Sequence, residues 1–224
     1  MAEVSAALAR GAARLGVALD EAQQSQLLRL AAELLRWNKA YNLTAITAPE
    51  AVLTHHLLDS LAVAPDLAGT SVADVGTGAG FPGLPLAIAQ PARQFTLIDA
   101  VDKKLRFVDH MIRELGLANA RTLHARVETL RPGHGSTALP ATFDTVIARA
   151  FAPLPRLLQL VAPLCGAHTR VLAMVGRWPP ADAAEAAIPA QWRLVSERPI
   201  EVPGLGAERH ILCLMQSATT PPGR

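Results

Sequence analysis

Cysteine is scarce in this sequence, which has only Cys165 and Cys213 among its 224 residues. Each stands alone inside an apolar stretch, and neither belongs to a set of side chains at the spacing typical of metal ligands. A disulfide framework and a structural zinc site are therefore excluded as the basis of the fold. We expect two buried, reduced thiols and no metal.

Long apolar runs are also missing. Charged residues or histidine interrupt every hydrophobic stretch before it reaches the roughly 18 residues of a membrane span. The beginning, Met1-Ala2-Glu3-Val4, lacks the basic and then apolar order of a secretory signal. We therefore expect no membrane segment and a cytoplasmic location.

The chain has little net charge, because 21 Lys and Arg residues stand against 19 Asp and Glu residues, giving +2. A protein with so weak a global field cannot rely on it to attract nucleic acid, so any phosphate contacts must be few and local. The hydrophobic content of 50% is enough for a sizeable core in one large domain with an appendage.

A glycine-rich stretch, Val72–Gly83, is the most informative part of the sequence. A short apolar strand with Asp74 near its end is expected to run into Gly76, Gly78 and Gly80, with a helix beginning directly afterwards. This Gly-x-Gly-x-Gly spacing differs from the Gly-x-Gly-x-x-Gly that seats a pyrophosphate on a helix N-terminus. A carboxylate at Asp74 would repel a pyrophosphate and attract a cationic amino-acid group. The stretch therefore predicts a site for S-adenosylmethionine.

A second acidic residue supports this interpretation. Asp99 ends the apolar segment Gln94–Asp99, nineteen residues after Gly80. In nucleotide-binding α/β folds, an acid at this point hydrogen-bonds the ribose hydroxyls. The alternative for the glycines alone is an ordinary turn, and Asp74 together with Asp99 makes that alternative weaker.

Strands and helices alternate from about residue 71, which predicts an α/β fold with a mostly parallel sheet covered on both faces. A final antiparallel pair of strands is expected at 192–202 and 208–216. The other expected strands lie near 71–76, 94–99, 121–125, 143–149 and 170–175, and the expected helices lie near 83–90, 102–116, 152–164 and 180–189. The segment 131–140, with two glycines and two prolines, is expected to be a loop.

Helices are also predicted before the glycine-rich stretch. Residues 3–15 form the first, and a capping box of Asp20 and Gln23 opens the second. A third is expected from Thr47, because Thr47 and Glu50 are spaced as a helix cap and Pro49 suits the first turn. The domains expected are an N-terminal helical region (1–66) packed on the core, a catalytic domain (67–216) and a disordered tail (217–224).

Several motifs together resemble the ribosomal RNA small subunit methyltransferase G family, also called glucose-inhibited division protein B, over about residues 20–216. The resemblance implies a Rossmann-like S-adenosylmethionine-dependent methyltransferase fold: a mostly parallel seven-stranded sheet with an antiparallel last strand and an N-terminal helical extension. It implies methylation of N7 of guanine 527 in bacterial 16S ribosomal RNA, within the 30S subunit or an assembly intermediate, by a monomer. The motifs are Arg36–Thr44, His56–Ser60, Gly76–Gly83, Arg126–Glu128, Arg149–Ala152 and Glu208–His210.

The resemblance also implies roles for individual residues. Gly76 and Phe81 match positions that line the methionine and adenine portions of the cofactor, Val127 and Glu128 match the pair that lies against the adenine, and Arg149 matches an arginine at the cofactor pocket. Contacts with RNA are expected from a set of mostly basic residues on the helices and at the strand ends. These candidates are Arg36, Asn38, Lys39, His56, Arg177 and Arg209.

One position departs from the family pattern, because Val175 stands where these proteins commonly have a lysine. Arg177, two residues further on, is a candidate substitute for that lysine. Two other residues have plain structural alternatives: His56 as a locally bonded histidine and Glu128 as an acid at a helix start.

The expected chemistry requires no catalytic base, because N7 of guanine already carries a free lone pair. Catalysis would come from positioning and electrostatics. The alternatives are a methyltransferase for another RNA or a small molecule, an NAD-dependent oxidoreductase, which Asp74 disfavours, and an RNA-binding module that holds the cofactor structurally.

Overall fold

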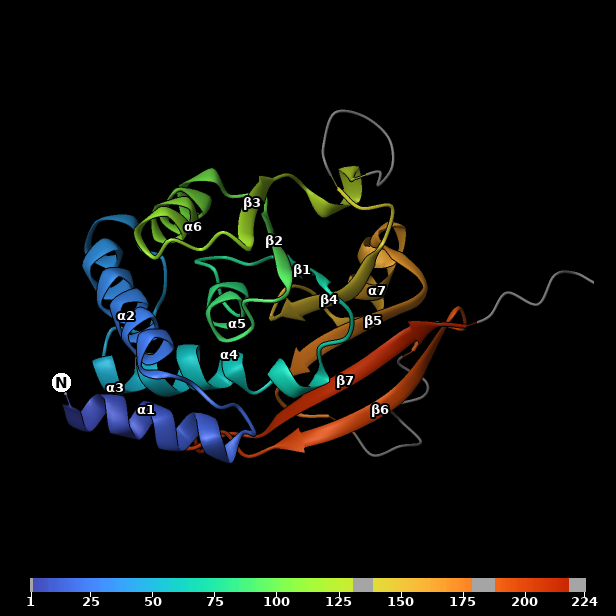
Figure 1. The fold of residues 1–224 in the computed structure, drawn as a ribbon. Coiled ribbons are helices and arrows are strands. Elements are labelled where there is room, and N and C mark those ends of the chain that lie inside the picture. The colour runs from blue at the N-terminus through green and yellow to red at the C-terminus, as the bar shows by residue number, and fades with distance from the viewer. Residues whose placement is uncertain (1, 131–138, 179–187, 218–224) are drawn as a thin grey trace, which may run out of the picture.

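The computed structural model describes residues 2–130, 139–178 and 188–217. Its centre is one seven-stranded sheet with helices on both faces (Figure 1). The N-terminal helices lie on one of these two faces. The strands are β1 (Ser71–Val75), β2 (Gln94–Asp99), β3 (Ala120–His124), β4 (Phe143–Arg149), β5 (Cys165–Val175), β6 (Trp192–Ile200) and β7 (Arg209–Gln216). The α-helices are α1 (Ala2–Arg14), α2 (Glu21–Tyr41), α3 (Pro49–Val52), α4 (Asp59–Leu61), α5 (Gly83–Ala89), α6 (Asp102–Glu114) and α7 (Leu154–Val161).

The order of the strands confirms the predicted fold class. They follow one another across the sheet as β3-β2-β1-β4-β5-β7-β6. The first five are parallel, whereas β7 runs antiparallel to both β5 and β6. The last strand in the chain therefore lies between two strands that precede it.

Successive residues of the central strands are buried on both faces of the sheet, because their side chains point alternately to one face and the other. In β1, Val72 packs with α2, α5 and α6 on one face, whereas Ala73 and Val75 pack with α7 on the other. The apolar runs in the sequence predict this two-sided burial. Both predicted thiols, Cys165 and Cys213, are free and buried.

The predicted element boundaries differ from the observed ones mainly in β5. This strand begins at Cys165 rather than near residue 170, and Cys165 pairs with Phe143 across a register shift. The helix predicted near 180–189, the loop at 131–140 and the tail from 217 fall largely or entirely outside the described residues.

The start of α2 is confirmed as a capping box. The Asp20 carboxylate accepts from Gln23 N at 2.7 Å, and the Gln23 side chain accepts from Asp20 N at 3.0 Å. At α3 the predicted cap is wrong, because the N-cap is Ala48 and it makes no side-chain bond, although Pro49 does occupy the first turn.

A π-helical turn, Leu53–Leu58, continues α3 into α4 and was not predicted. Such turns are rare and occur frequently at functional sites. This turn contains His55 and His56, and Asp59 follows it directly. Short 3₁₀ turns lie at Ala64–Asp66, Val127–Thr129 and Ala162–Leu164.

Within the described part of the chain, none of the helices is both long enough and apolar enough to cross a lipid bilayer.

Candidate active site

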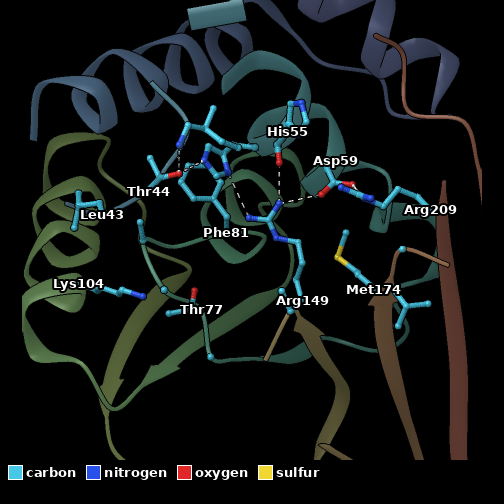
Figure 2. A pocket seen from close by; sticks show the side chains of 18 of the residues that line it. Leu43, Thr44, His55, Asp59, Thr77, Phe81, Lys104, Arg149, Met174 and Arg209 are labelled. Carbon is cyan, nitrogen blue, oxygen red and sulfur yellow. Dashed lines mark hydrogen bonds and ion pairs between the residues drawn. The ribbon is translucent and has the colours of Figure 1, made fainter. Parts of the chain in front are cut away.

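A cavity of about 650 Å³ lies where β1, β4 and β5 end, under the segments that surround the π-helical turn (Figure 2). This is the edge at which open α/β sheets bind ligands. The loop after β1 and the end of β4 line one side of the cavity, and the N-terminal segments line the other. The residues that matter below are Thr44, His55, His56, Asp59, Gly76, Thr77, Gly78, Phe81, Lys104, Arg149, Met174, Val175 and Arg209.

A second cavity, of about 290 Å³, adjoins the first. Most of its wall is apolar, and two arginines and Glu128 also line it. The residues that line it besides Gly76 and Ala152 are Val75, Ile98, Ala100, Ala125, Arg126, Val127, Glu128, Phe151, Arg156 and Leu160. Both cavities include Gly76 and Ala152 in their walls. Together they offer an elongated site, as a nucleoside with an amino-acid tail requires. Val127 and Glu128 lie where the resemblance implies, and their contact with adenine stays a prediction.

Gly76 lines both cavities, and only glycine fits there. Its φ is +71°, and an added Cβ would lie 2.2 Å from the Phe151 ring. Gly80, also predicted to bind the cofactor, lines neither cavity, and a Cβ there would lie 2.4 Å from Leu84. Gly80 therefore permits the close packing of the loop on α5 rather than contact with a ligand.

Asp99 holds the glycine loop in place from the end of β2. Its two carboxylate oxygens accept from Gly78 N and Val101 N, each at 2.8 Å. Because each oxygen has a further lone pair, the carboxylate can still accept from hydroxyl groups. The predicted ribose contact is compatible with this geometry and stays a prediction.

Asp74 does not face the cavity, which corrects the prediction that it attracts the cofactor directly. It is completely buried beneath the loop, where Oδ2 accepts from the Thr77 hydroxyl at 2.6 Å and from Gly83 N at 2.8 Å. Burial raises the pKa of Asp74 to about 6, against the opposing effect of these two bonds. The residue shapes the loop that a cofactor would contact.

The predicted pocket arginine, Arg149, is held by residues from the N-terminal region. Its Nη1 donates to the His55 carbonyl at 2.9 Å and to Asp59 Oδ2 at 3.0 Å. The other oxygen of Asp59 accepts from Arg209 Nε at 3.0 Å. Figure 2 shows Arg149 between Thr44 on one side and Asp59 with Arg209 on the other. Since Asp59 is nearly buried and serves two guanidiniums, this wall keeps a net positive charge.

His56 lines the cavity and is largely buried. Its ring stacks on Phe81 with centroids 4.7 Å apart, Nε2 lies 2.9 Å from Thr44 Oγ1, and Nδ1 lies 3.4 Å from Arg149 Nη2. Burial and the charge of Arg149 lower the pKa of His56 to about 4. The imidazole is therefore neutral near pH 7.

The other predicted RNA contacts have different environments. Asn38 is buried and bonds both backbone groups of Thr44, each at 2.9 Å, so its side chain holds the segment after α2 instead of being exposed for a contact with RNA. Arg36 pairs with Glu33 on α2 and lines neither cavity. Lys39 is exposed on the same helix. Of the predicted basic contacts on α2, neither Arg36 nor Lys39 lines the cavity to which Arg209 belongs.

Val175, the residue at the position that departs from the family pattern, lines the cavity. Arg177 does not line it; its exposed side chain lies 3.8 Å from Glu208. Arg209 Nη1 lies 4.0 Å from the place of a Cβ on the neighbouring Gly176. The guanidinium beside this wall is therefore that of Arg209, and a role of Arg177 in place of the lysine stays a prediction.

Several residues of the cavity wall were absent from the predicted site, among them Thr44, Thr77, Lys104 and Met174. Thr44 ends one of the motifs that carry the family resemblance, and this was the available signal. Among the residues that the structure describes, no group of three or more His, Cys, Asp and Glu side chains is arranged to hold a metal ion.

The family model and the most similar sequences both point to one protein family. A family model described as rRNA small subunit methyltransferase G matches residues 23–212. The ribosomal RNA small subunit methyltransferase G of Pseudomonas paraeruginosa is 44% identical over 212 residues, which are 94% of this chain and 95% of that protein. The protein of the same name from Aromatoleum aromaticum is 46% identical over 215 residues, covering 94% and 98%.

Solved structures share the fold at much lower identity. A magnesium protoporphyrin IX methyltransferase from Synechocystis, solved with bound S-adenosylmethionine, superposes with a TM-score of 0.57 at 16% identity, covering 89% of this chain and 99% of that one. An S-adenosylmethionine-dependent methyltransferase from Aquifex aeolicus gives a TM-score of 0.52 at 18% identity, covering 74% and 93%.

Proposed function

Because the chain belongs to the rRNA small subunit methyltransferase G family, we propose that it methylates N7 of guanine 527 in 16S ribosomal RNA. Family membership establishes an S-adenosylmethionine-dependent methyltransferase of small-subunit ribosomal RNA. It also rules out the alternative of an NAD-dependent oxidoreductase. The target atom and nucleotide are the proposed part.

The observation that carries the proposal is the pair of cavities that meet at Gly76. The smaller one offers apolar walls and Glu128 to an adenine, and the glycine loop with Asp99 lies ready for a ribose and a methionine tail. The larger one extends beyond the loop to the arginine wall, which is the side formed by Arg149 and Arg209, and this leaves space for a base. The residues present fit S-adenosylmethionine in this arrangement, with the target beside Arg149.

When bound, the cofactor supplies an electrophilic methyl group on a sulfonium. The protein's part is to align N7 with that methyl group, because the lone pair of N7 needs no deprotonation. His56 fits this division of roles, since both of its ring nitrogens already have partners. Arg149 and Arg209 are fixed by Asp59 before any ligand arrives, so their donors need little reorganisation during the reaction.

The proposed substrate form is the 30S subunit or an assembly intermediate, acted on by a monomer in the cytoplasm, where ribosomes assemble. The small net charge of +2 supports a structured substrate, because a weak global field gives little affinity for RNA in general.

Transfer of labelled methyl to small subunits from cells that lack the enzyme tests the proposal. Mass spectrometry of the RNA should find one 7-methylguanine, at position 527. Asp99→Ala should bind S-adenosylmethionine about 10- to 100-fold more weakly, since it removes a charged acceptor. A methyl group on another atom or nucleotide would contradict the proposed target while leaving the family assignment intact.

A further inference from the structure

Two hydroxyl side chains line the larger cavity, Thr44 and Thr77. The Thr77 hydroxyl is already used, because it donates to Asp74 at 2.6 Å. Thr44 is half-buried within the segment between α2 and α3, and the Asn38 side chain bonds both its backbone N–H and its carbonyl. Its hydroxyl is therefore held in a fixed place on the cavity wall.

The direction of the hydrogen bond between His56 and Thr44 follows from Arg149. A guanidinium has donors and no acceptor, so Nδ1 of His56 must accept from Arg149 Nη2. A neutral imidazole that accepts at Nδ1 carries its proton on Nε2. The low pKa of His56, about 4, agrees with a neutral ring. Nε2–H consequently donates to Thr44 Oγ1 across 2.9 Å.

A second donor reaches the same oxygen, because Ile46 N donates to Thr44 Oγ1 at 3.1 Å. A hydroxyl oxygen has two lone pairs and one proton. Both lone pairs are occupied, so Thr44 can act only as a donor toward anything further. No described residue is bonded as an acceptor of that proton, and the side chain borders the cavity (Figure 2).

We propose that the Thr44 hydroxyl donates a hydrogen bond to O6 of the target guanine and thereby selects guanine over adenine. This inference rests on the proposed function, since O6 lies beside N7 on the same edge of the base. Adenine presents an amino donor at that place. A hydroxyl whose lone pairs are already filled cannot accept from the amino group, so two donors would face each other.

The test is a double-substitution cycle, in which the hydroxyl is removed from the protein and O6 is removed from the base, singly and together. Thr44→Val is the matched variant, because valine replaces the hydroxyl by a methyl group at nearly the same volume, and Thr44→Ser keeps the hydroxyl. The substrates are small subunits reconstituted with ligated 16S RNA that carries guanine or 2-aminopurine at the target position. 2-Aminopurine keeps N7 and lacks O6. The measured quantity is kcat/KM for methyl transfer, together with the Kd for S-adenosylmethionine.

The wild-type enzyme should methylate guanine about five- to tenfold faster than 2-aminopurine, as one hydrogen bond implies. Thr44→Val should lower the rate on guanine by about the same factor and bring the ratio close to one, whereas Thr44→Ser should keep the wild-type ratio. A ratio that Thr44→Val leaves unchanged would overturn the inference, because mere loosening of the wall slows both substrates alike. Loss of S-adenosylmethionine affinity with an unchanged ratio would assign the hydroxyl to the cofactor instead. Absence of 7-methylguanine from the wild-type product would overturn the proposed function separately.

Discussion

At the scale of single residues, Asp59 has the most consequential contacts in the cavity. One carboxylate accepts from Arg149 and Arg209, two arginines that come from different strands, β4 and β7. The side chain of Asp59 is 3% exposed, and those of the arginines are 19% and 26% exposed. If this carboxylate is lost, the two guanidiniums remain close together without an opposite charge between them.

Asp59→Asn should therefore destabilise the protein by about 3 kcal/mol or more, because removing one member of a buried ion pair strands its partners. Urea unfolding measures the change. The matched control is Glu201→Gln, which breaks the exposed Arg14–Glu201 pair and should cost less than about 1 kcal/mol. Equal effects of the two substitutions would show that burial does not strengthen the Asp59 contacts.

Asp74 gives a pH dependence whose sign is fixed by its raised pKa. The folded protein holds the proton up to about pH 6, whereas an unfolded chain releases it near the ordinary value of 3.8. The stability that this group contributes is therefore complete below the unfolded pKa and is lost as pH rises through the folded one.

Asp74→Asn should remove the loss of stability that ionisation of Asp74 causes as pH rises. The free energy of unfolding of the variant, relative to wild type, should rise by up to about 3 kcal/mol between about pH 4 and pH 7. Urea titrations of both proteins at several pH values measure the difference, which cancels the other carboxylates. A difference that stays constant with pH would mean that Asp74 titrates at its ordinary value.

At the scale of elements, the capping box of α2 does two things. Asp20 and Gln23 satisfy each other's backbone donors, and the amide of Gln23 also donates to the Ile88 carbonyl in α5 at 3.0 Å. The box therefore begins the helix and attaches it to the core.

Asp20→Ala should lower the free energy of unfolding by about 1 kcal/mol, since it leaves the Gln23 N–H without its acceptor. Glu21→Gln, a first-turn change that leaves the box intact, should cost about 0.5 kcal/mol or less. Denaturant unfolding monitored by circular dichroism measures both. If the two variants were equally stable, charge near the helix start rather than the box would hold α2 in place.

Periodic patterns predicted most elements to within a residue or two, because apolar runs and glycine stops determine where β1, β2, β4 and α6 lie. The start of β5 was missed because Gly166 to Thr169 carries no apolar run. The π-helical turn was missed because its wider hydrogen-bond spacing has no sequence signature. It is this turn that presents the carbonyl of His55 to Arg149.

Gly76 and Arg149 line the cavity because the topology alone places them at the ends of β1 and β4, and their contact with the cofactor stays a prediction. Asn38 and Asp74 were misplaced because a polar residue beside a ligand motif looks the same in sequence whether it faces the ligand or the backbone. The contacts of Asp59 could not be predicted, since they join segments that only the tertiary structure brings together.

At the scale of the whole molecule, the distribution of charge bears on how RNA is held. The protein is almost neutral, and of the basic candidates only Arg209 lies in the cavity wall. Arg177 is exposed near the same edge of the sheet, beside the start of β7, whereas Arg193 is exposed near the opposite end, beside Met215.

Arg177→Ala should weaken the interaction with the RNA substrate and flatten its dependence on salt by about 0.7 in the log–log slope if one single-stranded phosphate contact is lost. Arg193→Ala should leave that slope unchanged. Rates of subunit methylation between low and moderate salt measure both, and S-adenosylmethionine affinity should stay the same in each. Identical slopes for the two variants would make Arg177 an ordinary solvated residue.

The position of β7 between β5 and β6 has a consequence for protein synthesis. The ribosome delivers Asp59 first, then Arg149, and supplies Arg209 only when the last strand emerges. Until then, β6 has no neighbour in the sheet, and the carboxylate has one of its two arginines. The arginine wall is therefore completed late, by the insertion of one strand. A nascent chain still short of that strand lacks Arg209, so the wall beside Asp59 is incomplete until the last strand is inserted.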